Sequence, residues 1–291
     1  MKNLKKTLAL LLALAMALVL AACGTEAPPQ TEAPGATEPA EEPAAEPVEL
    51  VVFAAASMEE TLTEIQGMYA SVAPNVTLVF NFDSSGTLKT QIQNAAPCDI
   101  FISAGQKQMD QLDIEADESV NTEGLDFVLA ESRIDLLENR VTLCVPEGNP
   151  KGIESFDQLA ELLEAGDVFM CMGNSDVPVG QYTQKIFAYY GLDETELANR
   201  QLISYGSNVK EVATQIKEGS VDCGVIYCTD AFSEGLEIVD YATAEMCGQV
   251  IYPAAVLKTS EHQEAAQAFL DYLSTDEAMA VFESVGFAPV Q

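Results

Sequence analysis

The sequence is poor in positive charge. Its 291 residues include 13 lysines and arginines against 46 aspartates and glutamates, so the formal net charge is −33. Three of the basic residues, Lys2, Lys5 and Lys6, lie at the very start of the chain, so the remainder is more acidic still. Such a surface repels nucleic acid and anionic membranes, and we expect neither as a partner. Any bound anion must therefore be held by local dipoles rather than by a general positive field.

Histidine is almost absent, and the cysteines lack the spacing of a metal site. His262 is the single histidine, and neither a G-x-S-x-G elbow nor a Cys–His pairing is evident. There is no paired C-x-x-C motif of the zinc type. We therefore expect no catalytic residue, no bare metal ion and no cofactor. A binding protein and a purely adhesive surface lipoprotein remain as alternatives.

Six cysteines follow residue 23, and several lie in apolar runs. Cys144 lies between Leu143 and Val145, and Cys171 follows Phe169 and Met170. Cysteine in such a run behaves as a small core hydrophobe. An even number of cysteines outside the cell would also allow disulfides. We expect mostly free thiols.

A long hydrophobic run occurs only at the start of the chain. Residues 1–22 combine the three lysines with an apolar stretch that is short for a membrane span and ends in small residues, which predicts a signal peptide. Leu20-Ala21-Ala22-Cys23 resembles a bacterial lipobox, in which Cys23 is lipidated and becomes the mature N-terminus. The alternative is an ordinary signal peptide followed by a chance cysteine. We expect an exported protein anchored by lipid to the outer face of the cytoplasmic membrane.

Residues 23–48 have too few hydrophobic residues to form a core. From Gly24 onward they are mainly Pro, Ala, Glu, Thr and Gly, and six of them are glutamates. Repulsion between these charges and the stiffness of the prolines predict a disordered linker between the lipid and the folded part.

From Glu49 onward, predicted strands and helices alternate. The first unit is a buried strand over 51–56, followed by Ser57 and a helix over 58–71. Ser57 occupies the N-cap position, and Glu60 completes an S-x-x-E capping box. The buried face of this helix would carry Leu62, Ile65, Tyr69 and Val72.

The alternation predicts an α/β fold with two lobes, each a mainly parallel sheet flanked by helices. We assign residues 49–138 and 249–291 to the first lobe and residues 139–248 to the second. The return of the last segment to the first lobe is implied only by the resemblance described below. Residues 113–139 are acidic and weakly periodic, and we interpret them as a helix with irregular structure.

Polar groups recur where predicted strands meet helices. Ser57 and Ser85 occupy two such corners, Val179 and Val209 begin two later helices, and Tyr227 ends a strand. The N-terminus of a helix at such a corner exposes backbone N–H groups that can bind an anion. If these corners converge, they form a pocket of uncharged donors for a small dianion. The alternatives are that Ser57 only caps its helix and that Tyr227 is a core tyrosine.

The same corners lie in segments that resemble a known family. In chain order the segments are Phe53-Ala54-Ala55-Ala56-Ser57, Ser84-Ser85-Gly86-Thr87-Leu88, Asp99-Ile100-Phe101-Ile102-Ser103-Ala104, Val177-Pro178-Val179-Gly180-Gln181-Tyr182 and Gly224-Val225-Ile226-Tyr227. Together they make residues 48–290 similar to the molybdate-binding proteins of ABC uptake transporters, which have the type II periplasmic-binding-protein fold. The resemblance implies that Ser57, Ser85 and Tyr227 bind the ligand through their hydroxyls, and Val179 and Val209 through their main-chain N–H groups.

The resemblance also implies a function. A monomeric lipoprotein would capture molybdate or tungstate between its lobes and deliver it to an ABC permease in the membrane. Sulfate or phosphate is the alternative ligand on the same fold.

Two features bear on the choice of ligand. Asp83 departs from the family's usual small neutral residue, and strand alternation should turn it away from Ser85. If it faced the pocket, it would favour a protonated, phosphate-like ligand. An iron-binding relative would need an adjacent tyrosine pair; Tyr189-Tyr190 is one, but we expect it to pack at the end of a helix.

Overall fold

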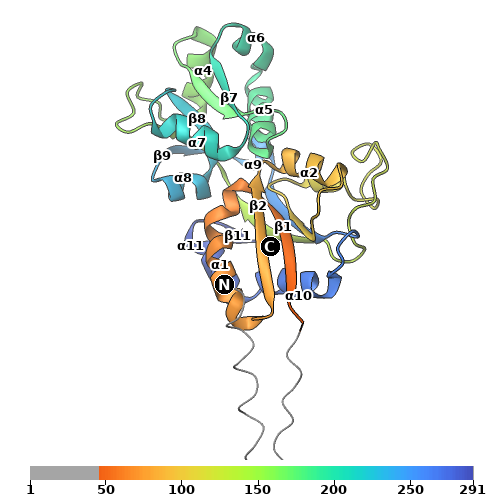
Figure 1. The fold of residues 1–291 in the computed structure, drawn as a ribbon. Coiled ribbons are helices and arrows are strands. Elements are labelled where there is room, and N and C mark those ends of the chain that lie inside the picture. The colour runs from red at the N-terminus through yellow and green to blue at the C-terminus, as the bar shows by residue number, and fades with distance from the viewer. Residues whose placement is uncertain (1–45, 291) are drawn as a thin grey trace, which may run out of the picture. The chain divides into compact units, whose positions relative to one another are not determined.

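The structure is a computed structural model that describes residues 46–290 (Figure 1). The predicted signal peptide of residues 1–22, the predicted lipidation site Cys23 and most of the predicted linker lie outside this part of the chain. Within residues 46–290, no helix combines the length and the apolar character needed to cross a membrane.

The first sheet has six strands, in the order β11-β4-β10-β3-β1-β2. Its strands are β1 (Val48–Ala55), β2 (Val76–Asp83), β3 (Ile100–Ile102), β4 (Ile134–Asn139), β10 (Val250–Val256) and β11 (Ala288–Pro289). The helices between them are α1 (Glu59–Val72), α2 (Ser85–Gln93), α3 (Gln106–Asp110), α10 (Gln263–Leu273) and α11 (Asp276–Ser284). β1 is parallel to β2 and β3, whereas β10 is antiparallel to β3 and β4.

The second sheet has five strands, in the order β7-β6-β8-β5-β9. Its strands are β5 (Val141–Val145), β6 (Met170–Gly173), β7 (Ile203–Gly206), β8 (Cys223–Tyr227) and β9 (Glu237–Tyr241). Its helices are α4 (Phe156–Ala165), α5 (Pro178–Tyr190), α6 (Glu194–Asn199), α7 (Val209–Lys217), α8 (Cys228–Glu234) and α9 (Ala244–Cys247). β6 is parallel to β7 and β8, whereas β5 is antiparallel to β8 and β9.

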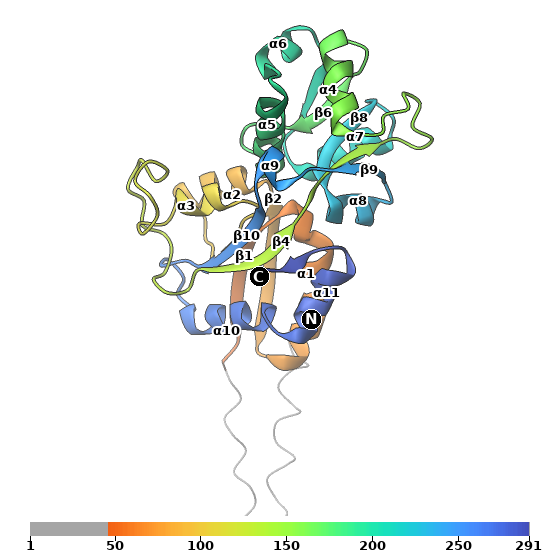
Figure 2. The same ribbon diagram turned by 180° about the vertical axis from the view of Figure 1, so that it is seen from behind.

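The α/β class with two sheets is confirmed, but each sheet is mixed rather than mainly parallel. Two of the strands with antiparallel neighbours, β5 and β10, receive the chain where it crosses between the sheets, whereas β11, which is antiparallel to β4, follows α11. β4 ends at Asn139 and β5 begins at Val141, so a single residue, Arg140, separates a strand of one sheet from a strand of the other. The chain returns through α9 between β9 and β10 (Figure 2). A strand that carries the chain directly into a second sheet needs no helical crossover, and it is therefore free to be antiparallel.

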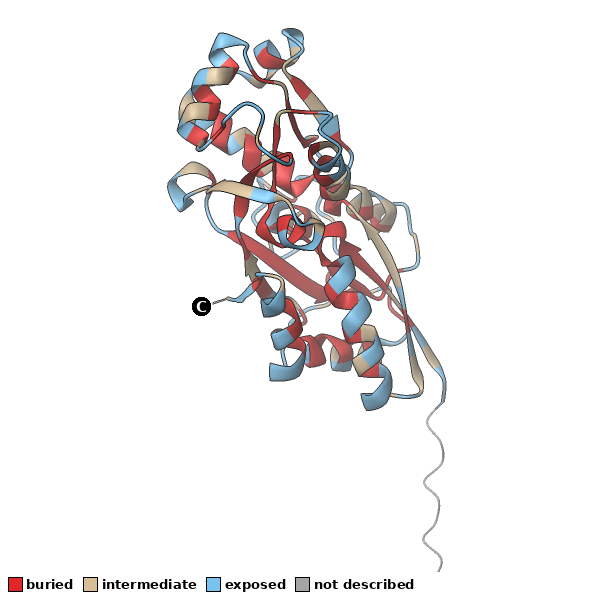
Figure 3. Ribbon diagram, turned by 90° about the vertical axis from the view of Figure 1, so that its left-hand side faces the viewer, coloured by how far each residue is buried: buried red, intermediate tan, exposed pale blue. Residues whose placement is uncertain are grey.

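The cores lie between the sheets and their helices, with the exposed residues mainly on the outer faces of the helices (Figure 3). Every residue of β5 and β10 is buried, which explains their continuous apolar sequences. In α1 the predicted face is buried at Leu62, Ile65 and Tyr69, but Val72 is 59% exposed. The prediction for Val72 was wrong because the helix ends at this residue.

The segment before β4 contains no helix after α3, which corrects the prediction for residues 113–139. Its side chains bind nearby backbone N–H groups instead. The carboxylates of Asp113 and Asp117 accept hydrogen bonds from the N–H groups two residues on, and Asn121 exchanges hydrogen bonds with Leu125. Such local bonds stabilise turns in competition with a helix.

The six cysteines of the described residues are all buried free thiols, as expected. Burial raises the pKa of the Cys144 thiol to about 12. A thiol with so high a pKa is unreactive at neutral pH, which fits a packing role.

Candidate ligand-binding site

A small cavity lies where segments of the two sheets meet. The first sheet contributes the residues that follow three of its strands, and the second contributes two helix starts and the end of β8. The lining residues are Ala55, Ala56, Ser57, Asp83, Ser84, Ser85, Ala104, Val177, Pro178, Val209 and Tyr227. Its volume is about 10 Å³, close to the room that one water molecule needs. Four of the five predicted site residues line this one cavity.

Ser57 does not cap α1. It lies in a 3₁₀ turn, Ala56–Met58, and α1 begins after Met58 without a side-chain cap. The Ser57 Oγ atom instead lies 2.9 Å from the Tyr252 hydroxyl, and Glu60 forms an ion pair with Lys210 of α7. The predicted capping box is therefore wrong, because both side chains have partners distant in the sequence.

Ser85 follows the residue that caps α2. The cap is Ser84, whose Oγ atom accepts a hydrogen bond from the Thr87 N–H at 3.2 Å. Ser85 is fully buried, and its Oγ atom accepts a hydrogen bond from the Ala104 N–H at 2.9 Å. One lone pair of the Ser85 hydroxyl is thus occupied by a donor, so its own hydrogen is available to an acceptor in the cavity.

Val209 is the first residue of α7, and it lines the cavity. The helix is capped by Asn208, whose side chain accepts a hydrogen bond from the Glu211 N–H at 3.0 Å. Within the described part of the chain, the Val209 N–H donates no hydrogen bond. As the first N–H of a helix it lies at the positive end of the helix dipole.

Val179, the second residue of α5, does not line the cavity with its side chain, and its neighbours Val177 and Pro178 do. The start of α5 packs directly on the end of β6. A Cβ atom added to Gly180 would lie 2.2 Å from the Gly173 carbonyl oxygen, so only glycine fits there. Among residues 46–290, no hydrogen bond is formed by the Val179 N–H.

Tyr227 is the last residue of β8 in the second sheet, and its hydroxyl contacts a residue that follows β3 of the first sheet. Its hydroxyl donates a hydrogen bond to the Ala104 carbonyl oxygen at 3.3 Å. Complete burial raises the pKa of the Tyr227 phenol well above its ordinary value, so it stays protonated and remains a donor. The backbone of Ala104 therefore contacts Ser85 through its N–H and Tyr227 through its carbonyl.

Asp83 lines the cavity, contrary to the expectation that it would face away from Ser85. Its Oδ1 atom accepts a hydrogen bond from the Ser84 N–H at 2.7 Å. Strand alternation does not determine the orientation of this side chain, because Asp83 is the last residue of β2 and its carboxylate is bound by the N–H of the following residue, Ser84. Asp83 is the one charged residue among those that line the cavity.

Sequence reasoning missed two polar residues behind the cavity, Tyr252 and Asn139. Both are buried, and the Asn139 Nδ2 atom donates a hydrogen bond to the Tyr252 hydroxyl at 3.1 Å. The available signal was a tyrosine within the apolar strand β10, since a buried phenol usually needs a hydrogen-bond partner.

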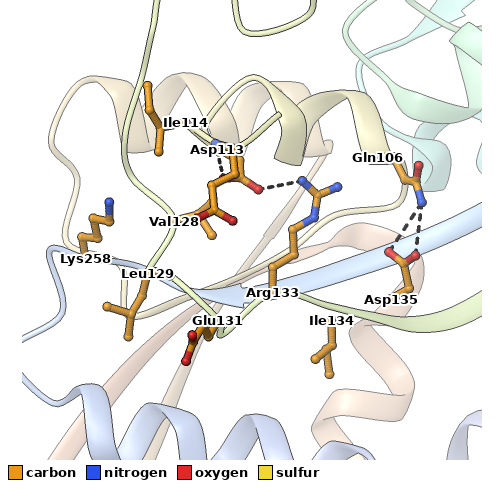
Figure 4. A pocket seen from close by; sticks show the side chains of 12 residues that line it. Gln106, Asp113, Ile114, Val128, Leu129, Glu131, Arg133, Ile134, Asp135 and Lys258 are labelled. Atoms are coloured by element: carbon orange, nitrogen blue, oxygen red, sulfur yellow. Dashed lines mark hydrogen bonds and ion pairs between the residues drawn. The ribbon is translucent and has the colours of Figure 1, made fainter. Parts of the chain in front are cut away.

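A pocket of about 350 Å³ on the first-sheet side is a less suitable anion site (Figure 4). Its two cations already have acidic partners. Arg133 pairs with Asp110 and Asp113 at 2.6 and 2.8 Å, and Lys258 pairs with Asp126. An anion entering this pocket would compete with these carboxylates.

The structure also bears on iron and other metals. Tyr189 is exposed and the Tyr190 hydroxyl donates a hydrogen bond to Asp157 at 2.6 Å, so the tyrosine pair packs at the end of α5, away from the cavity. In residues 46–290 no group of three or more His, Cys, Asp or Glu side chains is arranged to hold a metal ion.

Known proteins resemble this chain along most of its length. Residues 50–288 match the family described as bacterial extracellular solute-binding protein. The chain is 33% identical over 242 residues to YvgL of Bacillus subtilis, whose name describes an ABC transporter substrate-binding lipoprotein; the match covers 82% of this chain and 86% of that one. It is 30% identical over 269 residues to the molybdate-binding protein ModA of Mycobacterium bovis, which covers 92% of each chain.

The fold is also that of a solved structure. The periplasmic molybdate-binding protein of Azotobacter vinelandii superposes with a TM-score of 0.68 and 21% identity, over 83% of this chain and 100% of that one. We conclude that the chain belongs to the family of bacterial extracellular solute-binding proteins and is a solute-binding protein of an ABC transporter.

Proposed function

We propose that this protein captures molybdate or tungstate in the cavity and presents it to an ABC permease. The observation that supports this most is the donor set. The hydroxyls of Ser57, Ser85 and Tyr227 and the start of α7 line one cavity, and no lysine or arginine lines it. Helix N-termini and hydroxyls suit an anion that carries no proton of its own. The M. bovis relative, named for molybdate, supports the same ligand.

Ligand entry requires the two lobes to separate. We propose lobes of residues 49–138 with 249–291, and of residues 139–248, hinged at the two crossings between the sheets. A cavity of about 10 Å³ has little room for a tetrahedral oxyanion. The Tyr227–Ala104 hydrogen bond and the Lys210–Glu60 ion pair join segments of the two sheets and would break as the lobes open.

Export and lipid anchoring complete the proposal. The targeting segment of residues 1–22 and the lipobox cysteine Cys23 would place the protein on the outer face of the cytoplasmic membrane. The name of YvgL, a lipoprotein, supports this arrangement.

Phosphate is the second candidate ligand, and Asp83 favours it. A protonated phosphate needs an acceptor for its O–H group, and Asp83 is the one acidic residue among those that line the cavity. Without an acceptor, the buried O–H would cost about 1–3 kcal/mol. Sulfate carries no proton at neutral pH, and only its smaller size would exclude it.

Thermal melting with each candidate ligand tests the proposal. Molybdate and tungstate should raise the melting temperature, since a ligand at about 1,000 times its Kd adds about 4 kcal/mol. Sulfate, phosphate and ferric citrate are compared in the same way. Ser57→Ala should reduce the shift because it removes a donor. Tyr227→Phe should reduce it because it removes the phenol hydrogen that the Ala104 carbonyl accepts in the unliganded protein and that the ligand would take over. Tyr272→Phe is the matched control, since Tyr272 lies in α10 and does not line the cavity.

Two outcomes would contradict this proposal. Unchanged melting with both molybdate and tungstate would exclude them as ligands. A shift with phosphate alone would support the second candidate and give Asp83 the role of acceptor.

A further inference from the structure

A chain of buried hydrogen bonds lies behind Ser57. The Ser57 Oγ atom is 2.9 Å from the Tyr252 hydroxyl, which is 3.1 Å from the Asn139 Nδ2 atom. The same Nδ2 atom is 3.0 Å from the Thr229 Oγ1 atom. All four residues are buried, at 5% exposure or less. The chain joins the end of β4 and the start of α8 to a residue of the candidate site.

The direction of these bonds is determined by Asn139. The Arg140 N–H donates to the Asn139 Oδ1 atom at 2.8 Å, so the oxygen of this amide is identified by its donor. The NH₂ group of Asn139 therefore points toward Tyr252 and Thr229, and each of its two hydrogens has an acceptor. The Tyr252 oxygen accepts one of them.

The direction of donation can then be followed from Asn139 through Tyr252 to Ser57, which lines the cavity. A phenol has a single hydrogen, and because Asn139 occupies the Tyr252 oxygen as a donor, the Tyr252 hydrogen goes to the Ser57 Oγ atom. Complete burial raises the pKa of the Tyr252 phenol well above its ordinary value, so this hydrogen is retained. Ser57 accepts from Tyr252, and its own hydrogen is available to an acceptor in the cavity. The Ser85 hydroxyl likewise accepts a hydrogen bond, from the Ala104 N–H, so its own hydrogen is also available to an acceptor in the cavity.

We propose that Asn139 and Tyr252 are positioning residues that hold the Ser57 hydroxyl as a donor to the ligand and thereby select against oxyanions that carry a proton. This inference rests on the proposed function, and it extends it to two residues outside the cavity. A ligand O–H group would need Ser57 to accept, but the Ser57 oxygen already accepts from Tyr252 and directs its own hydrogen to the cavity, so Ser57 presents a donor to the ligand. Asp83 would be left as its acceptor.

Titration calorimetry with molybdate and with phosphate tests the inference on four variants. Tyr252→Phe removes the donor to Ser57, and it should weaken molybdate binding about tenfold and reduce the preference for molybdate over phosphate. Ser57→Ala should weaken molybdate binding by a similar factor. The double variant should be no weaker than Ser57→Ala, because Tyr252 acts through Ser57. Tyr272→Phe is the control, since this buried hydroxyl has no hydrogen-bond partner in the described residues.

Asn139→Asp gives a second test that does not depend on the folding of Tyr252→Phe. The change keeps the shape of the side chain and replaces its donor group by an acceptor. The Tyr252 hydrogen would then go to residue 139, so that Ser57 donates to Tyr252 and no longer to the ligand. Molybdate binding should again fall about tenfold.

The outcomes separate this inference from the proposed function. If the wild-type protein binds neither molybdate nor tungstate, the proposed function fails. If the wild type binds molybdate and either Tyr252→Phe or Asn139→Asp binds it equally well, the positioning role is wrong. Losses that multiply in the double variant would also overturn it, since they would show that Tyr252 acts independently of Ser57.

Discussion

Asp230 is a buried carboxyl group without a hydrogen-bond partner in the described residues. Burial is the main cause that raises its pKa from 3.8 to about 7; Lys210 acts to lower the pKa, and the nearby acidic groups of Glu60 and Glu234 act to raise it. These three charges come from α1, α8 and α7. The folded protein therefore holds a proton on Asp230 more tightly than the unfolded chain does. Its contribution to stability is fully present below about pH 4 and is lost as the pH rises through about 7.

Asp230→Asn should remove this pH dependence. Between pH 5 and pH 8, the wild-type protein should lose on the order of 3 kcal/mol more unfolding free energy than the variant, because only the wild type must ionise a buried carboxyl. Urea unfolding at both pH values measures the difference. An equal change in the two proteins would show that Asp230 does not titrate in this range.

At the scale of elements, the start of α5 depends on its contact with β6. The sequence Val177-Pro178-Val179-Gly180 combines a proline, which is favourable in the first turn of a helix, with a glycine that meets backbone oxygen. A Cβ atom at Gly180 would lie 2.2 Å from the Gly173 oxygen and 2.3 Å from the Asn174 oxygen. Neither oxygen can move without displacing the end of β6.

Gly180→Ala should therefore lower the unfolding free energy by at least about 1–3 kcal/mol, the usual cost of overpacking. It should also reduce the shift in melting temperature on addition of molybdate, since the start of α5 moves. Gly67→Ala is the control, because nothing lies within 4 Å of a Cβ atom at that helical position. Equal stability of the two variants would contradict the role of the close contact.

At the scale of the whole described molecule, another glycine lies where the two proposed lobes meet. A Cβ atom at Gly86 of α2 would lie 2.2 Å from the Asp176 carbonyl oxygen, which precedes α5 in the second lobe. This conflict differs from the one at Gly180. Rotation of one lobe away from the other relieves it without unfolding either lobe.

Gly86→Ala should favour the open arrangement of the lobes. We expect a larger radius of gyration by small-angle X-ray scattering and weaker molybdate binding, with little change in the melting temperature of the unliganded protein. Gly67→Ala again serves as the control. If Gly86→Ala keeps the wild-type radius and affinity, the contact does not limit closure.

The local sequence determined the alternation of strands and helices and the corners at Ser57, Ser85, Val209 and Tyr227. Apolar runs, helix caps and glycines act over a few residues, so their consequences can be derived from neighbouring positions. The same reasoning failed at residues 113–139, where Asp and Asn side chains bind the backbone and replace a helix with turns.

Only the tertiary structure decided what the corner residues contact. Ser57 and Tyr252 are separated by 195 positions, and Asn139 and Tyr252 by 113. Such bonds depend on the order and register of strands that are distant in the sequence, and no local pattern encodes them. The mixed direction of both sheets and the place of Asp83 in the cavity have the same origin, because each depends on where a strand ends relative to segments that the chain reaches much later.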